Sequence, residues 1–141
     1  MQEHPLEHAR RWLSQAHADF EAAEANVAAQ RYSLACFLCQ QSAEKALKAA
    51  LIWLRGDYPR QHIIGKLIEE LALADVATAE RLKASSELDL YYQSTRYPDA
   101  IGGAIPAATF HNRQASLAID LAKDVLEIVD AILIEAQNGA D

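Results

Sequence analysis

Apolar residues recur at steps of three and four along the first part of the chain. One stripe of such positions consists of Ala9, Leu13, Ala16, Phe20, Ala23 and Val27. This spacing is typical of an amphipathic helix with one buried face. Pro5 suits the first helical position, because the N–H group that proline lacks would have no partner there. We therefore predict a helix that begins near Pro5 and ends at a turn around Gln30 and Arg31.

A second helix is predicted from about Tyr32 to Arg55, and its apolar residues cover more than one side. One side carries Ala35, Leu38, Ala46 and Trp53, and another carries Phe37, Leu47, Leu51 and Leu54. A helix that is apolar over most of its circumference is buried by several neighbours. We therefore place this helix at the centre of the fold, with Gly56 as its C-terminal stop and a turn at residues 57–59.

Two further helices are predicted in the middle of the chain. A short helix after His62 is indicated by Ile64, Leu67, Ile68 and Leu71. A fourth helix, capped by Asp75 or Thr78, would turn inward Leu82, Leu88, Tyr92 and Thr95. Pro98 ends it, because the residue before a proline disfavours helical geometry.

The last third of the chain is predicted to hold one long loop and one long helix. The loop runs from Asp99 to Pro106 and contains Gly102 and Gly103, so we expect it to be mobile. The helix runs from about Thr109 to Gln137, and residues 138–141 form a frayed tail. Its apolar stripe consists of Ala118, Leu121, Val125, Ile128, Ile132 and Ala136.

These patterns predict an all-α fold, an up-and-down bundle of about five helices, four long and one short. No useful stretch alternates apolar and polar residues as a strand does. Short connections between long helices imply antiparallel neighbours. The 141 residues fit one domain, 1–141, with a core of about 6–136. A hydrophobic share of 51% with only nine Gly and Pro favours a globular helical chain.

Charge and composition narrow the function. The net charge of −7 argues against diffuse coating of nucleic acid, although it leaves room for local phosphate binding. No apolar run is long enough to cross a membrane, and the chain does not begin with a secretion signal. With two cysteines only, the sequence favours a reduced, cytoplasmic setting.

A line of polar residues runs along the second predicted helix. It consists of Gln41, Glu44, Lys45 and Lys48. Glu44 and Lys48 are four residues apart in the order that favours a helical ion pair. One interpretation is a solvated face. The other is a basic edge that meets a phosphate, which gains weight because this helix otherwise looks buried and a buried charge needs a partner.

The segment from Tyr91 to Asp99 contains Arg96 at the end of a predicted helix. An arginine there can bond the last carbonyls of the helix. Alternatively, its planar guanidinium can grip a phosphate, with Asp99 fixing the guanidinium and the three tyrosines of this segment stacking on bases.

Metal-binding patterns are weak in this sequence. Cys36 and Cys39 have the spacing of a zinc or redox pair, but no second pair exists, so we interpret them as buried small apolar residues. His4 and His8 have helical metal-pair spacing, but Pro5 puts His4 at the helix start. We expect neither a metal nor a cofactor.

Taken in order, these motifs resemble the HEPN domain family. The helical motif consists of Phe37, Gln40, Gln41, Ala43, Glu44, Lys45, Ala46, Leu47 and Lys48. A loop with Pro59 and His62 follows it, and then the run of residues 96–99, Arg-Tyr-Pro-Asp. The resemblance covers the chain from about Leu6 to Ala136.

This resemblance implies a helical bundle that is commonly a homodimer. It also implies a minimal nucleotidyltransferase as partner protein, in a toxin–antitoxin-like pair. Several branches of the family are metal-independent RNases with an Arg followed, after four to six residues, by a His. Arg96 matches the arginine, but the positions of the expected His hold Ile101, Gly102 and Gly103, and His111 comes too late.

The departure from the motif favours a nucleotide- or phosphate-binding interaction module over an enzyme. Its candidate ligand-binding residues are Gln41, Glu44, Lys45, Lys48, His62, Arg96, Tyr97 and Asp99. The first alternative is a metal-independent endoribonuclease that uses Arg96, with His62 or His111 for proton transfer and RNA as its substrate. The second alternative is a helical oligomerisation domain without a ligand.

Overall fold

The chain folds into helices only, within the part that the structure describes. The computed structural model describes the backbone of residues 3–140 and the side chains of residues 3–139. The α-helices are α1 (Pro5–Ala28), α2 (Tyr32–Arg55), α3 (Ile64–Ala72), α4 (Val76–Leu82), α5 (Pro106–Thr109) and α6 (Asn112–Ala140). Two 3-10 helices, η1 (Lys83–Tyr91) and η2 (Pro98–Ile101), complete the set. The all-α bundle predicted from the sequence is confirmed.

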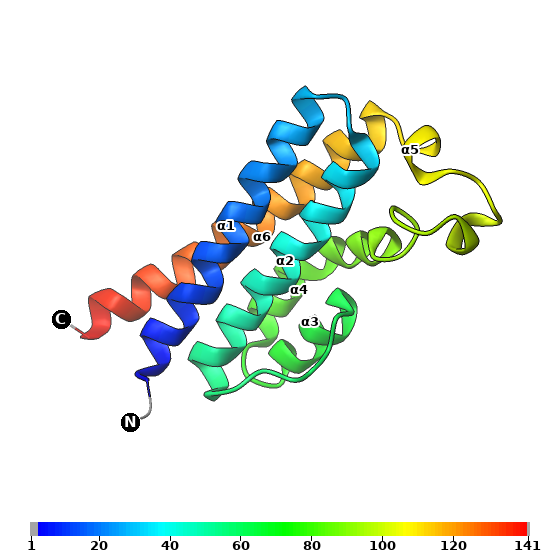
Figure 1. Cartoon of the computed structure of the whole chain (residues 1–141). Helices are drawn as coiled ribbons and strands as arrows, with labels where there is room; N and C mark the ends of the chain where they lie inside the picture. The colour runs from blue at the N-terminus through cyan, green and yellow to red at the C-terminus, as the bar shows by residue number, and fades with distance from the viewer. Residues whose placement is uncertain (1–2, 141) are drawn as a thin grey trace.

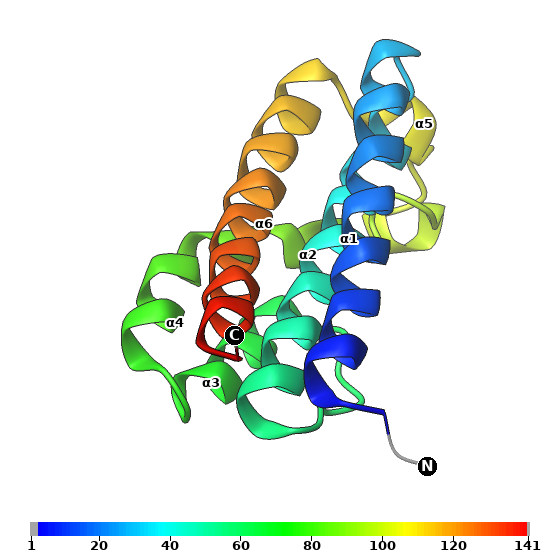
Figure 2. The ribbon, with the colours of Figure 1, turned by 90° about the vertical axis from the view of Figure 1, so that its left-hand side faces the viewer.

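Three long helices, α1, α2 and α6, lie side by side and form the body of the bundle (Figures 1 and 2). Helix α2 packs against both of the others and also against α3, α5 and η1, so it is the central element, as predicted. Helices α3 and α4 pack against one another beside α2 and α6 (Figure 2). No helix among the described residues has the length and apolar character needed to cross a membrane.

The ends of the first two helices follow their local sequence. Pro5 is the first residue of α1, and the Leu6 amide donates to Nδ1 of His4 at 3.1 Å. His4 thus caps a helix N-terminus, where N–H groups lack partners inside the helix. Gly56 ends α2 with a φ of 89°, a conformation that glycine adopts without the strain a side chain would add.

The long fourth helix predicted from the sequence is absent. Helix α4 ends at Leu82, and the chain continues as η1. In this segment the Ser85 hydroxyl donates to the Leu82 carbonyl at 2.5 Å, and the Ser86 hydroxyl donates to the Lys83 carbonyl at 2.9 Å. Serine hydroxyls that bond a nearby carbonyl compete with the regular helical pattern and favour such tighter turns.

The segment predicted as one long loop also differs from the prediction. It contains η2 and α5, each one turn long, joined at Gly102 and Gly103 with φ of 67° and 88°. In Figure 1 this segment extends away from the long helices. Helix α6 begins at Asn112 rather than near Thr109. It continues to Ala140, so the predicted fraying of residues 138–140 is wrong, and Asp141 lies outside the described residues.

Candidate functional site

The polar line on α2 is largely internal. Glu44 and Lys48 are each 4% exposed, and the Lys48 ammonium donates to Glu44 Oε2 at 3.0 Å. The same ammonium lies 5.7 Å from the ring centre of Trp12 and 5.6 Å from that of Tyr58, within cation–π range. The interpretation of this line as a solvated face is therefore wrong for Glu44 and Lys48. Each of these two buried charges has the other as its partner, as a buried charge requires.

The other members of the line also have partners within the protein. Lys45 forms an ion pair with Asp19 on α1, and Gln41 donates to the Oε1 atom of Gln40 at 2.8 Å. Contact of Lys45 or Lys48 with a phosphate stays a prediction. In this structure each of the two lysines already has a carboxylate partner, so a phosphate would have to compete with it.

His62 is attached to the buried pair. Its Nδ1 atom lies 3.2 Å from Glu44 Oε2, the same oxygen that accepts from Lys48. An ionised carboxylate only accepts hydrogen bonds, so the Nδ1–H group of His62 donates to Glu44. In the neutral imidazole, Nε2 is then the acceptor. The side chain is 58% exposed, so His62 joins the buried pair to the surface.

Backbone contacts also fix the position of His62. The side-chain Nε2 of Gln40 donates to the backbone carbonyl of His62 at 3.2 Å. The side-chain oxygen of Gln61 accepts from the His62 and Ile63 amides at 3.1 and 3.0 Å. The first bond joins the segment before α3 to α2, and the other two lie within that segment, so together they position His62.

Arg96 lies just beyond η1 with its guanidinium on the surface. Its Nε donates to the Tyr92 carbonyl at 2.9 Å, and Nη2 donates to the same oxygen. The centre of the guanidinium lies 4.2 Å from the ring centre of Phe37 and 4.9 Å from those of Tyr92 and Tyr97. The predicted bond to a carbonyl at the helix end is therefore present, and the guanidinium packs among the three rings.

Asp99 does not hold Arg96. No hydrogen bond or ion pair joins these two side chains in the described part of the chain, and Asp99 is exposed at the start of η2. The backbone turns into η2 immediately after Tyr97, whereas the guanidinium is bonded four residues back along the chain. The expectation that Asp99 would fix Arg96 is therefore wrong for this structure.

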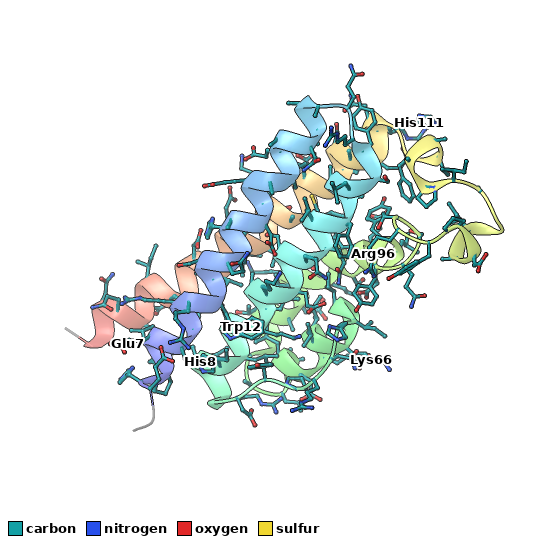
Figure 3. The ribbon with its side chains drawn as sticks, viewed as in Figure 1. Glu7, His8, Trp12, Lys66, Arg96 and His111 are labelled. Atoms are coloured by element: carbon teal, nitrogen blue, oxygen red, sulfur yellow. The ribbon has the colours of Figure 1, made fainter. Side chains whose placement is uncertain are left out.

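His62 and Arg96 meet on one aromatic ring. The His62 imidazole stacks on Tyr92 with ring centres 5.6 Å apart, and the Arg96 guanidinium lies over the same ring. His111 is exposed just before α6, where its amide donates to Gln114. Figure 3 shows it away from Arg96, beside α5. Of the two histidines considered from the sequence, His62 is the one at this site.

The three tyrosines near Arg96 differ in their surroundings. Tyr91 is 9% exposed and packs edge-on against Phe110, so it is a core residue. Tyr92 is half-buried, and its ring already contacts the His62 imidazole and the Arg96 guanidinium. Tyr97 is 52% exposed. The expectation of three base-stacking tyrosines is therefore wrong for Tyr91, and Tyr97 has the most accessible ring.

A groove of about 570 Å³ lies beside this cluster. It is lined by Gln61, His62, Ile63, Asp89, Leu90, Tyr92, Gln93, Ser94 and Ala100. The Asp89 carboxylate accepts from the amides of Ile64 and Gly65 at 2.6 and 2.9 Å. It thus caps α3, where the positive end of the helix dipole offsets its charge. The sequence offered no sign of this contact, because Asp89 is 24 residues away from Gly65.

The two cysteines belong to the core, as predicted. Both are fully buried free thiols. Burial raises the pKa of Cys36 to about 12 and raises that of Cys39 further. Among the described residues, no group of three or more His, Cys, Asp or Glu side chains is arranged to hold a metal ion.

Comparisons with known proteins agree with this architecture. The chain superposes on the crystal structure of TT1696 from Thermus thermophilus with a TM-score of 0.80 and 38% identity, over 87% of this chain and 96% of that one. It superposes on ST0689, described as an archaeal HEPN homologue, with a TM-score of 0.71 and 32% identity, over 89% and 97% of the two chains.

Sequence comparisons give two further matches, one to a single protein and one to a family. A protein of Methanocaldococcus jannaschii, named "Putative toxin MJ1304", is 26% identical over 139 residues, which are 92% of this chain and 91% of that protein. The family model described as the HEPN domain matches residues 9–132. Because that match spans most of the chain and both structures align nearly throughout, the protein belongs to the HEPN domain family.

Proposed function

We propose that this protein binds the phosphate of a nucleotide through Arg96, at the groove beside His62. One observation carries the proposal: the guanidinium is exposed and fixed on three aromatic rings, and within residues 3–139 it has no carboxylate partner. An arginine left without one is available for an external anion.

The geometry suits a phosphate. One edge of the guanidinium bonds the Tyr92 carbonyl, and the remaining N–H groups of this planar donor are available to pair with phosphate oxygens. The rings of Phe37 and Tyr97 restrict the side chain before a ligand arrives, which lowers the entropy cost of binding. The groove volume of about 570 Å³ lies in the range of small-ligand sites.

A binding titration tests this proposal. Isothermal titration calorimetry with thymidine monophosphate is expected to give binding for the wild type and for Arg113→Ala, and none for Arg96→Ala. Arg113 is an exposed arginine on α6 and serves as the matched control. Equal binding by Arg96→Ala and Arg113→Ala would sink the assignment of the phosphate to Arg96.

We further propose that the protein acts in the cytoplasm as the toxin-like member of a pair, with a minimal nucleotidyltransferase as its partner. Membership of the HEPN family and the similarity to the M. jannaschii protein support a toxin-like role. A homodimer is part of this proposal. Capture from the native host with a tagged copy tests it, and recovery of the protein without any nucleotidyltransferase would count against the partner.

A second candidate function is metal-independent RNA cleavage, and the His62–Glu44 contact favours it. The 3.2 Å contact orients the imidazole so that Nε2 can act as a base. In such a reaction Nε2 takes the proton of a 2′-hydroxyl, and the 2′ oxygen bonds to phosphorus. The bond from phosphorus to the 5′ oxygen breaks, and that oxygen takes a proton from water. Arg96 would stabilise the charge on the phosphate.

Fragment analysis of an RNA pool tests this candidate in the presence of EDTA. Cleavage is expected for the wild type and for His111→Ala, and its loss is expected for His62→Ala and Arg96→Ala. His111 provides a matched control because it is an exposed histidine that does not line the groove and that Figure 3 shows away from Arg96. Intact RNA in the wild-type sample would leave phosphate binding alone as the function.

A further inference from the structure

The ammonium of Lys48 is enclosed between α1, α2 and the segment that joins α2 to α3. Its side chain is only 5% exposed. Nζ lies 5.7 Å from the ring centre of Trp12 on α1, labelled in Figure 3, and 5.6 Å from that of Tyr58 in the joining segment. The two rings also pack on one another, with centres 4.7 Å apart. A cation shielded from water in this way acts on its few neighbours more strongly than an exposed one does.

Glu44 connects this buried charge to the imidazole of His62. Its Oε2 atom accepts from the Lys48 ammonium at 3.0 Å and lies 3.2 Å from Nδ1 of His62. Its Oε1 atom accepts from the side-chain Nε2 of Gln40 at 3.2 Å. Glu44 is 4% exposed, and a carboxylate buried to this extent stays ionised only beside a cation. As long as His62 is neutral, Lys48 is that cation.

The other charged groups around His62 are engaged elsewhere. Asp89 lines the same groove, but both of its carboxylate oxygens accept from amides at the start of α3. The Arg96 guanidinium lies over the ring of Tyr92, on which His62 stacks, and donates to the Tyr92 carbonyl. Within residues 3–139, Glu44 is therefore the carboxylate that the imidazole contacts.

We propose that Lys48 is the positioning residue of His62: its charge keeps Glu44 ionised, holds the hydrogen of the imidazole on Nδ1 and leaves Nε2 without one. The reason is charge balance. Without the ammonium, either the buried carboxylate takes up a proton, or His62 takes one up and becomes the cation that Glu44 needs.

Both results place a hydrogen on Nε2. A protonated Glu44 donates to Nδ1, so the hydrogen of the neutral imidazole moves to Nε2, whereas a charged imidazole carries a hydrogen on each nitrogen. Nε2 then no longer accepts a proton. This nitrogen is the base of the proposed RNA cleavage, so the functional meaning of the inference rests on that candidate function.

Nuclear magnetic resonance of isotopically labelled histidine nitrogens tests the proposal in the free protein. A ring nitrogen that carries a hydrogen resonates well upfield of one that does not. The chain has five histidines, and the signals of His62 are identified by their loss in His62→Ala. Spectra are recorded at about pH 8, where an ordinary imidazole is neutral. Wild type, Lys48→Met, Lys48→Gln and the control Lys45→Met are compared after circular dichroism has shown which are folded.

Lys45 is the matched control because it lies on the same helix and pairs with Asp19 instead of Glu44. In the wild type and in Lys45→Met, Nδ1 of His62 should carry the hydrogen and Nε2 should carry none. In Lys48→Met, Nε2 should carry a hydrogen. Lys48→Gln removes the charge but keeps a donor, so it should shift in the same direction and serves where Lys48→Met does not fold.

Two spectra would overturn the proposal. One shows a hydrogen on Nε2 of His62 in the wild type, and the other shows Nε2 without a hydrogen in the folded Lys48 variants.

RNA cleavage gives a second readout if the wild type cleaves. Lys48→Met should then cleave slower by about tenfold or more at about pH 7, because the base is protonated. It should recover part of this loss at higher pH, where the additional proton leaves, and a loss of stability alone would not produce that recovery. Lys45→Met should cleave like the wild type. Cleavage by Lys48→Met at the wild-type rate would overturn the inference. Intact RNA in the wild-type sample would remove the candidate function, and the nitrogen spectra would still decide the role of Lys48.

Discussion

The imidazole of His62 lies nearly parallel to the ring of Tyr92, with the two planes 13° apart and the ring centres 5.6 Å apart. The Arg96 guanidinium lies over the same tyrosine. One aromatic side chain thus brings together His62 and Arg96, which are 34 positions apart in the sequence. The two groups that we propose for phosphate binding and proton transfer both pack on this ring.

Loss of the Tyr92 ring is therefore expected to weaken the site. Tyr92→Leu should weaken binding of thymidine monophosphate several-fold in calorimetry, because Arg96 and His62 lose a shared stacking surface. Tyr92→Phe keeps the ring and should bind like the wild type. The carbonyl that accepts from Arg96 belongs to the backbone and remains in both variants. Equal loss in the Phe and Leu variants would contradict a stacking role and implicate the hydroxyl.

The buried pair of Glu44 and Lys48 is expected to dominate the effect of polar substitutions on stability. Lys48→Met leaves the Glu44 carboxylate buried without its ion-pair partner and should cost roughly 3–5 kcal/mol of unfolding free energy. Glu44→Gln should cost a similar amount. The double variant should lose less than the sum, since both charges are then gone. Urea denaturation followed by circular dichroism measures all three.

Lys45→Met is the control for this series. Lys45 pairs with Asp19, and the Lys45 side chain is 23% exposed against 5% for Lys48, so loss of the Lys45 pair should cost less than loss of the Lys48 pair. A loss as large as that of Lys48→Met would show that burial of the pair is not what sets the cost.

The cysteines are expected to be unreactive in the folded protein. Attack on iodoacetamide requires the thiolate, and burial raises the pKa of Cys36 to about 12 and that of Cys39 further. At pH 8 the native protein should take up no label over a period in which a urea-unfolded sample takes up a label on each of its two cysteines. Mass spectrometry counts the labels. Rapid labelling of the native chain would mean that α2 opens readily.

The cap of α4 is expected to make stability depend on acid. Asp75 accepts from the hydroxyl and the amide of Thr78, and these bonds hold its pKa below the ordinary value. A carboxyl with a lower pKa in the folded state contributes stability above its unfolded pKa of about 3.9. That contribution is lost as the pH falls through the folded value.

Urea midpoints of the wild type and Asp75→Asn test this dependence. Asparagine still caps a helix but carries no charge. The wild type should be the more stable at pH 7, and the difference should disappear in strong acid. Thr78→Val, which removes the hydroxyl donor, should show a weaker pH dependence than the wild type. If the difference in stability between the wild type and Asp75→Asn stays constant with pH, the charge of Asp75 does not contribute to the pH dependence.

The helices could be predicted where one repeating pattern decides them. The stripe from Ala9 to Val27 and the apolar circumference of α2 gave α1 and the central element, because burial of a face imposes a helical period. The prediction of a long fourth helix was wrong from Lys83 onward, in the segment that contains Ser85 and Ser86. Their hydroxyls bond carbonyls three residues earlier and so compete with the regular helical hydrogen bonds. The pattern of apolar positions contains no information about these hydroxyl bonds.

The site was harder to predict for a related reason. Arg96 stood out through its place at a helix end, and Glu44 and Lys48 through their spacing. The contact of Glu44 with His62 joins residues 18 apart on different elements, and no local pattern encodes it. The same holds for Asp89, whose role exists only once η1 packs on α3. Contacts of this kind follow from tertiary packing, so they appear only in the structure.

The cap that Asp89 gives to α3 has a mechanical consequence. Ile63 and Leu90 both line the groove, and this carboxylate joins them, because it bonds the two amides that follow Ile63 and belongs to the residue before Leu90. The segment before α3 and the end of η1 can therefore separate at this point only if both hydrogen bonds break. Folding of the chain thus links two segments of the groove lining, so we expect the groove at this point to be preorganised for the proposed ligand rather than to form around it.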